Sequence, residues 1–505
     1  MQMILGPILR FLGADPQENT WRVSCLIVIG GADAPPPLTW SIGKGKKTKV
    51  EGVEIATHRD RRVITYAIEA QRGDEPRAVD YRLGAGRGAP GSSFKIPARG
   101  ERPRSAFASC CGFSSLKAMK TVNDKYERWR DLLTVHAAAP YHLLILGGDQ
   151  VYADPLWESI RGLEEWNEQS PLIANVLPMK PELAAEIDDF FFDLYLHRWA
   201  QPDYAAALAS VPTIMMWDDH DIFDGWGSYP PLRQSSPVFQ GIFAVARRWF
   251  RTFQLHLGEG GSPELLVPER GLTYAYRIDD IAILALDLRS ERRQEHIMSP
   301  ESWRAAFSWL EGQHGLSHLM VVSSIPVVFP DLTRLQDLLG RIPGEQELED
   351  DLRDHWYSRA HQGERLRLIH RLLDHSRDRR ARVTLLSGDV HVPGLGLIES
   401  TRPGDGLITI SQLISSALVH PPPPASVVYA LDKIMSERGE FDRGITASMQ
   451  SLPGTRRRLI CARNWMSIEP DDATSWPSRR RLWVHWRIEG ETEPYTTVIA
   501  PLDPQ

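Results

Sequence analysis

Three short apolar runs of this chain end in acidic residues. They are Leu143–Asp149, Thr213–Asp221 and Val383–His391. A short run of β-forming residues that is closed by glycine or by charged residues is typical of a strand in the interior of a sheet. Because functional groups gather at the carboxyl ends of strands in open α/β sheets, we expect the three acidic ends to converge on one site.

The hydrophobic pattern changes near Ser105. Short alternating segments precede it and are typical of the strands of a small β-sandwich, at 21–29, 63–68 and 79–83. Five glycines and three prolines between Gly84 and Arg104 indicate a loop-rich link. We therefore predict a β-sandwich domain with its linker at residues 1–104.

In the remaining chain, apolar segments alternate with segments of helical periodicity. This alternation predicts an α/β fold of mixed sheets flanked by helices, which we assign to residues 105–505. Helical insertions are expected at 155–212 and 331–380, and the second should cover a face or an edge of the sheet. Alternating residues at 482–488 and again at 495–499 predict a C-terminal β-hairpin.

The composition of the chain limits which classes of protein it can belong to. The chain has 505 residues, of which 42% are hydrophobic and 24% are charged, as in an ordinary enzyme. Its net charge of -7 argues against bulk binding of nucleic acid. Four cysteines do not make a disulfide framework in a chain of this length. The sequence has neither a signal peptide pattern nor a run of about 18 apolar residues, so we expect no transmembrane segment and a cytoplasmic location.

The acidic ends offer ligands for hard cations. Asp149 is the best candidate for a bridging ligand, because one carboxylate can touch two ions and the preceding Gly147–Gly148 pair allows a sharp turn. Asp389 and His391 are two residues apart, so in extended backbone they project from the same face and can meet one ion. Two cations a few ångströms apart suit displacement at phosphorus, because they stabilise both the attacking and the leaving oxygens.

The segment Asp218–Asp221 holds three carboxylates around His220. Without cations, repulsion between these carboxylates should raise some of their pKa values and cost stability. His220 titrates near neutrality and is a candidate general acid toward the leaving oxygen. The spacing leaves open whether His220 binds a metal ion instead.

Three motifs and four further segments follow the order of one known family. Gly148–Tyr152 reads Gly-Asp-x-x-Tyr, Trp217–Asp221 reads Trp-Asp-Asp-His-Asp, and Ser387–His391 reads Ser-Gly-Asp-Val-His. The further segments are 108–110, 286–290, 354–357 and 410–416. Together they resemble the PhoD-like (alkaline phosphatase D) branch of the calcineurin-like metallophosphoesterases.

The resemblance implies a metallophosphoesterase α/β sandwich with a site for Fe³⁺ and Ca²⁺. Cys110 would supply a thiolate and Tyr152 a phenolate to the ferric ion, and Asp149 would bridge it to one or more divalent ions. The ligand shells would be completed by Asp219, Asp389 and His391. Trivalent iron favours anionic thiolate and phenolate donors, whereas calcium prefers oxygen.

Two features depart from the family pattern. Members usually carry a pair of asparagines shortly after the Asp-Asp-His motif, whereas this chain has Asp224 in that region, which would replace an amide ligand by a carboxylate. The twin-arginine export signal of well-known members is not found here, which favours an intracellular phosphate ester as the substrate.

Two residues have competing interpretations. Cys111 competes with Cys110 for the metal position; successive side chains of an extended segment point to opposite faces, so only one should reach the site, and we favour Cys110. Arg289 follows the strand that ends at Asp287 and is a candidate to hold a phosphate oxygen. A structural salt bridge is the alternative for Arg289.

These residues together predict a metal-dependent hydrolase of small phosphate esters, either a phosphomonoesterase or a phosphodiesterase. A metal-bound hydroxide at a multinuclear site would attack phosphorus, and His220 would assist departure of the alcohol. The nearest alternative is a phosphodiesterase that acts on phospholipids or nucleotides. An alternative of another class is a non-catalytic protein that binds metal or phosphate. The sequence identifies no protein partner.

Overall fold

The computed structural model describes residues 2–15, 17–85, 89–258, 260, 264–329, 356, 358–434, 439–471 and 481–502. Within these ranges the chain forms two large sheets, one small sheet and flanking helices. The α/β fold class predicted from the sequence is therefore confirmed. Among the helices that the structure describes, none combines the length and the apolarity needed to cross a membrane.

The larger sheet has ten strands. Its order is β22 (Tyr495–Ile499), β21 (Leu482–Ile488), β20 (Asn464–Pro470), β9 (Ser105–Ala108), β10 (Leu143–Gly147), β11 (Thr213–Met216), β1 (Gln2–Asp15), β2 (Thr20–Gly30), β6 (Arg61–Gln71) and β5 (Val53–His58). The strands β9, β10 and β11 are parallel neighbours. Every residue of these three strands is buried, which is why their sequences are continuous apolar runs and not alternating patterns.

The second sheet has eight strands. Its order is β12 (Tyr274–Ile278), β13 (Ile281–Ala285), β14 (His318–Val322), β15 (Arg382–Ser387), β17 (Ile408–Ile414), β16 (Gly394–Ser400), β19 (Ile445–Gln450) and β18 (Gly439–Asp442). Along β14 the side chains alternate between two cores. Leu319 and Val321 join the core shared with the flanking helices, whereas Met320 and Val322 join the core of the larger sheet. The two large sheets therefore share an apolar interior.

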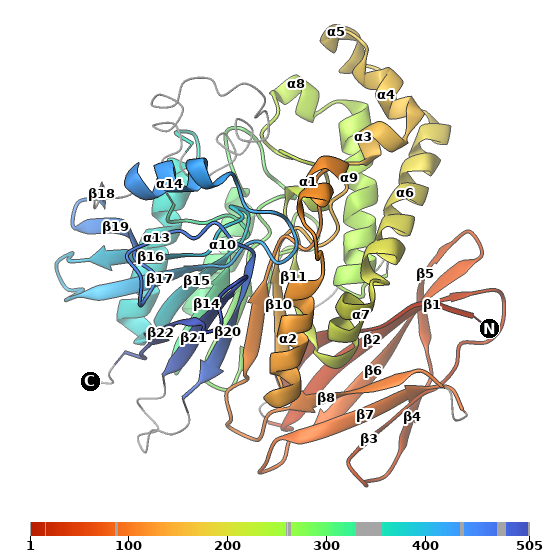
Figure 1. Cartoon of the computed structure of the whole chain (residues 1–505), viewed down its shortest axis with the longest axis horizontal. Coiled ribbons are helices and arrows are strands. Elements are labelled where there is room, and N and C mark those ends of the chain that lie inside the picture. The colour runs from red at the N-terminus through yellow and green to blue at the C-terminus, as the bar shows by residue number, and fades with distance from the viewer. Residues whose placement is uncertain are drawn as a thin grey trace.

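Helices cover the outer faces of both sheets (Figure 1). The larger sheet carries α2 (Glu127–Ala138), α6 (Pro181–Trp199), α7 (Pro202–Ser210) and α9 (Pro237–Trp249), and the second sheet carries α10 (Pro300–Glu311) and α13 (Gln362–Arg379). Further helices are α1 (Leu116–Thr121), α3 (Leu156–Ser159), α4 (Arg161–Asn167), α5 (Pro171–Ala174), α8 (Pro231–Gln234) and α14 (Ala425–Ile434). The segment 155–212 thus contains α3 to α7.

The N-terminal strands continue the larger sheet. β1 pairs in parallel with β11, with Arg10 opposite Thr213, so β1, β2, β6 and β5 extend the sheet beyond β11. A four-stranded sheet consists of β4 (Thr48–Val50), β3 (Leu38–Ile42), β7 (Arg77–Leu83) and β8 (Gly91–Ile96). It contributes Leu38, Val79 and Phe94 to the same core. The N-terminal β-structure is thus continuous with the rest of the fold, and a domain boundary at residue 104 stays a prediction.

Two other segments named in the sequence analysis differ in how much of them the structure describes. At the C-terminal end, β21 and β22 pair antiparallel, with Leu482 opposite Ile499, at one edge of the larger sheet. Most of the segment 331–380 lies outside the described residues. Its described part contains α13, which packs on β15 and β17.

Candidate metal centre

Four strands end beside the candidate metal centre, and each is followed at the second position by a possible metal ligand. Cys110 follows β9, Asp149 follows β10, Asp218 follows β11 and Asp389 follows β15. The first three strands are parallel neighbours in the larger sheet, so their carboxyl ends lie side by side. β15 brings Asp389 from the second sheet. The three acidic endings of the sequence thus converge.

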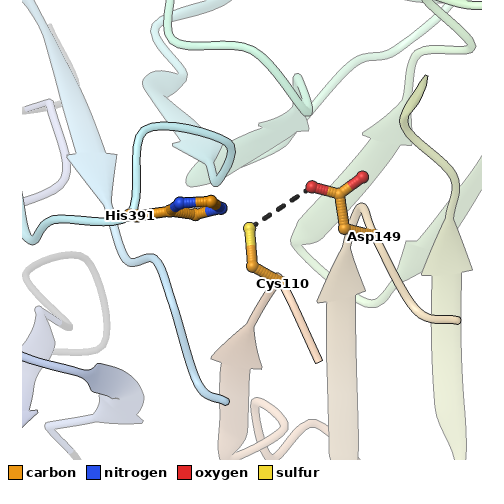
Figure 2. A group of neighbouring side chains, drawn as sticks. All are labelled: Cys110, Asp149 and His391. Carbon is orange, nitrogen blue, oxygen red and sulfur yellow. Dashed lines mark hydrogen bonds between the residues drawn. The ribbon is translucent and has the colours of Figure 1, made fainter. Parts of the chain in front are cut away.

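Three groups of side chains could each hold a metal ion. The groups are Cys110 with Asp149 and His391, Asp149 with Asp219 and His220, and Asp218 with Asp219 and Asp389. Within each group the ligand atoms lie within 4.8 Å of one another. Asp149 belongs to two groups, and so does Asp219. We call these seven residues together with Tyr152 the metal centre; Figure 2 shows its first group, with His391 and Asp149 on either side of the Cys110 sulfur.

The backbone of the metal centre is strained. φ is +54° at Cys110, +58° at Asp149 and Tyr152, +68° at Asp389 and +53° at His391. These are five of the ten non-glycine residues with positive φ in the described part of the chain. A left-handed conformation costs a non-glycine residue roughly 1 to 3 kcal/mol, and such residues cluster where function requires a fixed geometry. The concentration here therefore indicates a functional site.

The two glycines before Asp149 are required by close packing. A Cβ atom on Gly147 would lie 2.5 Å from Cζ of Phe107, and one on Gly148 would lie 2.9 Å from Cβ of Asp218. Gly148 also has φ of +127°, which side chains rarely allow. The glycines therefore let β10 deliver Asp149 directly against Asp218.

Asp149 shows that the donors fit a cation. Its side chain is buried, and its Oδ1 atom has no hydrogen-bond partner. Burial raises the pKa of its carboxyl group well above the usual range; the charge of His220 lowers it, while the charges of Asp218 and Asp219 raise it further. A buried carboxylate oxygen without a partner is costly, and a metal ion between such carboxylates removes that cost.

The two adjacent cysteines face different surroundings. Cys110 Sγ lies 3.4 Å from Asp149 Oδ2 and 3.0 Å from Ser416 Oγ (Figure 2). Burial and the charge of Asp149 raise the pKa of the Cys110 thiol, so a thiolate at this position needs a nearby cation. Cys111 packs in the main apolar core beside Tyr204. Of the two cysteines, Cys110 is thus the one that reaches the metal centre.

Tyr152 lies in a stack of rings at the metal centre. Its hydroxyl lies 3.4 Å from His391 Nε2, and burial followed by the charges of Cys110 and Asp149 raises its pKa. His420, which the sequence analysis missed, lies with its ring centroid 4.0 Å from that of His391 and 5.5 Å from that of Tyr152. The rings of His391, His420 and Tyr152 therefore support one another's orientation.

The tautomer of His420 follows from its neighbours. Its Nδ1 atom lies 2.9 Å from the carbonyl oxygen of Pro421, which can only accept, so Nδ1 carries the proton. Nε2 then accepts from the hydroxyl of Ser114 at 3.1 Å. Burial lowers the pKa of His420 to about 3, which keeps the ring neutral.

His220 is oriented by a carboxylate that the sequence analysis also missed. Its Nδ1 atom lies 2.9 Å from Asp154 Oδ2, and its ring stacks on Tyr152 with centroids 4.4 Å apart. Burial lowers the pKa of His220, but the charges of Asp154 and Asp219 outweigh burial and raise it well above its usual value. The charges of Asp154 and Asp219 therefore favour the protonated form of the His220 imidazole, in which Nε2 is a second donor.

Arg289 binds two carboxylates of the metal centre. Its guanidinium group is fully buried and forms ion pairs with Asp218 and, at 3.1 Å, with Asp219 Oδ1. Its Nη1 atom donates to the carbonyl oxygen of Trp226 at 3.1 Å. This arrangement is the structural salt bridge that the sequence left open, and a contact between Arg289 and a phosphate oxygen stays a prediction.

Asp221 fixes the loop that follows Asp149. Its Oδ1 atom accepts from the backbone N–H groups of Gln150 at 2.9 Å and Val151 at 3.2 Å, and from Gln254 Nε2 at 3.2 Å. Its Oδ2 atom accepts from the N–H of Asp218 at 3.1 Å. Burial raises the pKa of Asp221 to about 7. Asp221 thus ties the loop of Asp149 and Tyr152 to the loop of Asp218.

Asp224 does not belong to any of the three groups formed by the described residues. Its N–H donates to Asp154 Oδ1 at 2.8 Å, and its carbonyl oxygen accepts from the Tyr229 hydroxyl at 2.9 Å. Through these backbone contacts Asp224 supports the carboxylate that orients His220. Its predicted role as a metal ligand stays a prediction.

Comparison with known proteins identifies the family. The pattern of the PhoD related phosphatase family matches residues 113–342 and 335–438. The Uncharacterized protein YGR266W of Saccharomyces cerevisiae is 27% identical over an alignment 573 residues long. The alignment covers 93% of this chain and 81% of that protein.

Two solved structures share the fold. The structure of PhoD has a TM-score of 0.57 at 14% identity and covers 99% of this chain and 92% of its own. The purple acid phosphatase PPD1 from yellow lupin (Lupinus luteus) seeds has a TM-score of 0.50 at 10% identity, over 98% of this chain and 74% of its own. Both are metallophosphoesterase folds, as the sequence motifs predicted. Because the family pattern spans more than half of its length, the chain belongs to the PhoD related phosphatases and is a phosphatase enzyme.

Proposed function

We propose that the protein hydrolyses small phosphomonoesters or phosphodiesters with Fe³⁺ and Ca²⁺ bound at the metal centre. Cys110, Tyr152 and His391 would hold the iron, and Asp219 and Asp389 would hold calcium. Asp149 would bridge the two kinds of ion. When bound, such cations polarise phosphoryl oxygens and lower the pKa of water, which are the two effects that metal-assisted hydrolysis requires.

The observation that carries this proposal is the position of Asp149. It is shared by two groups of possible ligands, and one of its buried oxygens has no partner. The donors on its two sides differ in kind. On one side lie a thiol, a phenol and an imidazole, which suit iron, and on the other side lie carboxylates, which suit calcium.

The chain's own residues supply the remaining chemistry. His220 would donate the proton on Nε2 to the leaving oxygen, because Asp154 holds its Nδ1–H and fixes the plane of the ring. Asp221 would keep the Asp149 loop in position through its contacts with the N–H groups of Gln150 and Val151. Arg289 would hold Asp218 and Asp219 at a fixed distance from the phosphate.

The test is Asp149→Asn, assayed on p-nitrophenyl phosphate and bis(p-nitrophenyl) phosphate. Loss of the bridging charge should reduce kcat/KM by about 1000-fold or more, because metal-assisted stabilisation of the transition state amounts to several kcal/mol. The matched control is Asp60→Asn, an exposed turn residue far from the metal centre in sequence. Equal activity of the two variants would refute the proposal. The ratio of the two substrates assigns monoester or diester preference.

A further inference from the structure

A second candidate site lies between β5 and the end of α9. It is a groove of about 1060 Å³. Its lining includes Ile55, Thr57, Phe243, Ala244, Arg247 and Arg251, and we call it the arginine groove. None of these residues belongs to the metal centre. The volume is at the upper end of the range for pockets that bind small molecules, so the groove has room for a metabolite and not only for a single ion.

Other charged residues at the groove are already paired. Arg248 forms an ion pair with Asp188 at 3.0 Å, and Glu54 accepts from the Thr57 hydroxyl at 2.7 Å and lies 3.6 Å from Arg62. These charges are balanced inside the protein. They therefore do not determine which ligand the groove prefers.

Arg247 and Arg251 differ from these residues, because their described partners are backbone carbonyl oxygens. Arg247 donates to the carbonyl oxygen of Pro268 at 3.1 Å, and Arg251 donates to those of Gly258 at 3.3 Å and Gly260 at 2.6 Å. Among the residues that the structure describes, no carboxylate forms an ion pair with either guanidinium group. Burial and the positive charge of Arg247 lower the pKa of Arg251. Two cations thus lie close together, and within the described part of the chain neither is paired with an anion.

The backbone that carries Arg251 is unusual. Directly after α9, residues Phe250–Gln254 form a π-helix, η2. Single π-turns of this kind are rare and are frequently found at functional sites. Here the π-turn contains both Arg251, which lines the groove, and Gln254, whose Nε2 atom donates at 3.2 Å to Asp221, the residue that fixes the loop of Asp149. A ligand in the groove would therefore contact the same turn that supports the metal centre from the other side.

We propose that the arginine groove binds a small organic phosphate with at least two negative charges. Planar guanidinium groups bind phosphate oxygens through paired hydrogen bonds, and two of them would neutralise a dianion. Ile55 and Phe243 offer an apolar surface for the organic part of the ligand. Phe243 is itself held in place by stacking on Trp226, with centroids 4.8 Å apart and planes at 6°. The groove is separate from the proposed catalytic site and adds a second phosphate site to the protein.

The experiment uses phenylphosphonate, which carries a dianion and an apolar ring and has no ester bond to hydrolyse. Its binding to the metal-loaded protein is measured by titration calorimetry. Ala244 is exposed on α9 and lines the groove, so Ala244→Glu introduces a carboxylate beside Arg247 without disturbing the core. Ala244→Gln is the control of equal size. We expect two sites in the native protein and in Ala244→Gln, and loss of one site, or affinity at least tenfold weaker there, in Ala244→Glu.

A second pair of variants tests whether the two arginines themselves bind the ligand, independently of the new carboxylate. The double variant Arg247→Gln/Arg251→Gln should lose the groove site. The control is the double variant Arg161→Gln/Arg304→Gln, which changes the net charge equally at exposed positions and should retain the groove site. Equal binding by Ala244→Glu and Ala244→Gln would overturn the proposal. Asp149→Asn should remove phenylphosphonate binding at the metal centre and leave binding in the arginine groove unchanged. Failure of the proposed catalytic function can therefore be distinguished from failure of the groove to bind phosphate.

Discussion

The metal centre and the arginine groove have opposite charge and share one electrostatic feature. At the metal centre, several buried carboxylates and a thiol lie together, and one oxygen of Asp149 has no partner. In the groove, Arg247 and Arg251 lie close together and bind only carbonyl oxygens among the described residues. Each region is thus incompletely neutralised by the residues that the structure describes. The comparison teaches that incompletely balanced charge, buried at the metal centre and half-buried in the groove, indicates a candidate site whichever sign it has, and that the sign indicates the ligand.

Removal of metal should have the largest effect, and this effect should be confined to the metal centre. Dialysis against a chelator should reduce phosphatase activity by about 1000-fold or more, because the cations that stabilise the transition state are lost. Added Fe³⁺ and Ca²⁺ should restore it. Binding of phenylphosphonate in the arginine groove should persist in the metal-free protein, as measured by calorimetry. Loss of both sites together would show that the two regions are not independent.

Asp154→Asn tests the orientation of His220 within the metal centre. General acid catalysis typically contributes 10²- to 10⁴-fold, and we expect a loss of roughly 100-fold in kcat for an alkyl phosphate. p-Nitrophenyl phosphate should lose much less, because its leaving group needs no proton. The two kcat values are compared by steady-state kinetics. Equal losses for both substrates would assign Asp154 a merely structural role.

Cys110 and Cys111 are adjacent in the chain, with Cα atoms about 3.8 Å apart, and they offer a second comparison. Cys110→Ser should lower activity by roughly 10- to 100-fold and reduce the iron content, because a hydroxyl is a poor substitute for a thiolate ligand. Cys111→Ser should lower the free energy of unfolding by about 1 kcal/mol, since it places a hydroxyl in the apolar core, and leave the activity of the folded protein unchanged. Activity assays and urea denaturation check both. The reverse pattern would mean that Cys111 is the ligand.

The smallest expected effect concerns the residue that connects the two regions. Gln254 donates to Asp221 at 3.2 Å and to the Tyr195 hydroxyl at 3.0 Å. Gln254→Leu should reduce stability by about 1 kcal/mol and activity by about fivefold, because the loop of Asp149 loses one of its supports. Thermal denaturation and kcat measure these changes. Unchanged activity would remove Gln254 from the support of the metal centre.

Much of the fold and of the metal centre can be predicted from local sequence. Interior parallel strands are buried along nearly their whole length, so β10, β11 and β15 stand out as mainly apolar runs, and each is followed at its second position by an acidic residue. Motifs that cluster at strand ends are therefore visible without a structure. Alternation predicts only that one of the two adjacent cysteines reaches the site, and the choice of Cys110 over Cys111 rests on the family resemblance.

Long-range contacts could not be predicted in the same way. The parallel pairing of β1 with β11 joins residues about 200 positions apart, and nothing in the alternation of β1 identifies its partner. Asp154 and His420 reach the metal centre from loops, where no periodicity constrains the direction of a side chain. The arginine groove has no motif at all, because its two sides come from β5 and from α9 with η2.

The most direct test of the metal centre is elemental analysis of the protein purified without chelator, together with its visible absorption spectrum. The account predicts iron and calcium bound in the same protein, and a charge-transfer band from the Tyr152 phenolate that disappears in Tyr152→Phe. Protein that retains no metal even after reconstitution with Fe³⁺ and Ca²⁺ would contradict the account.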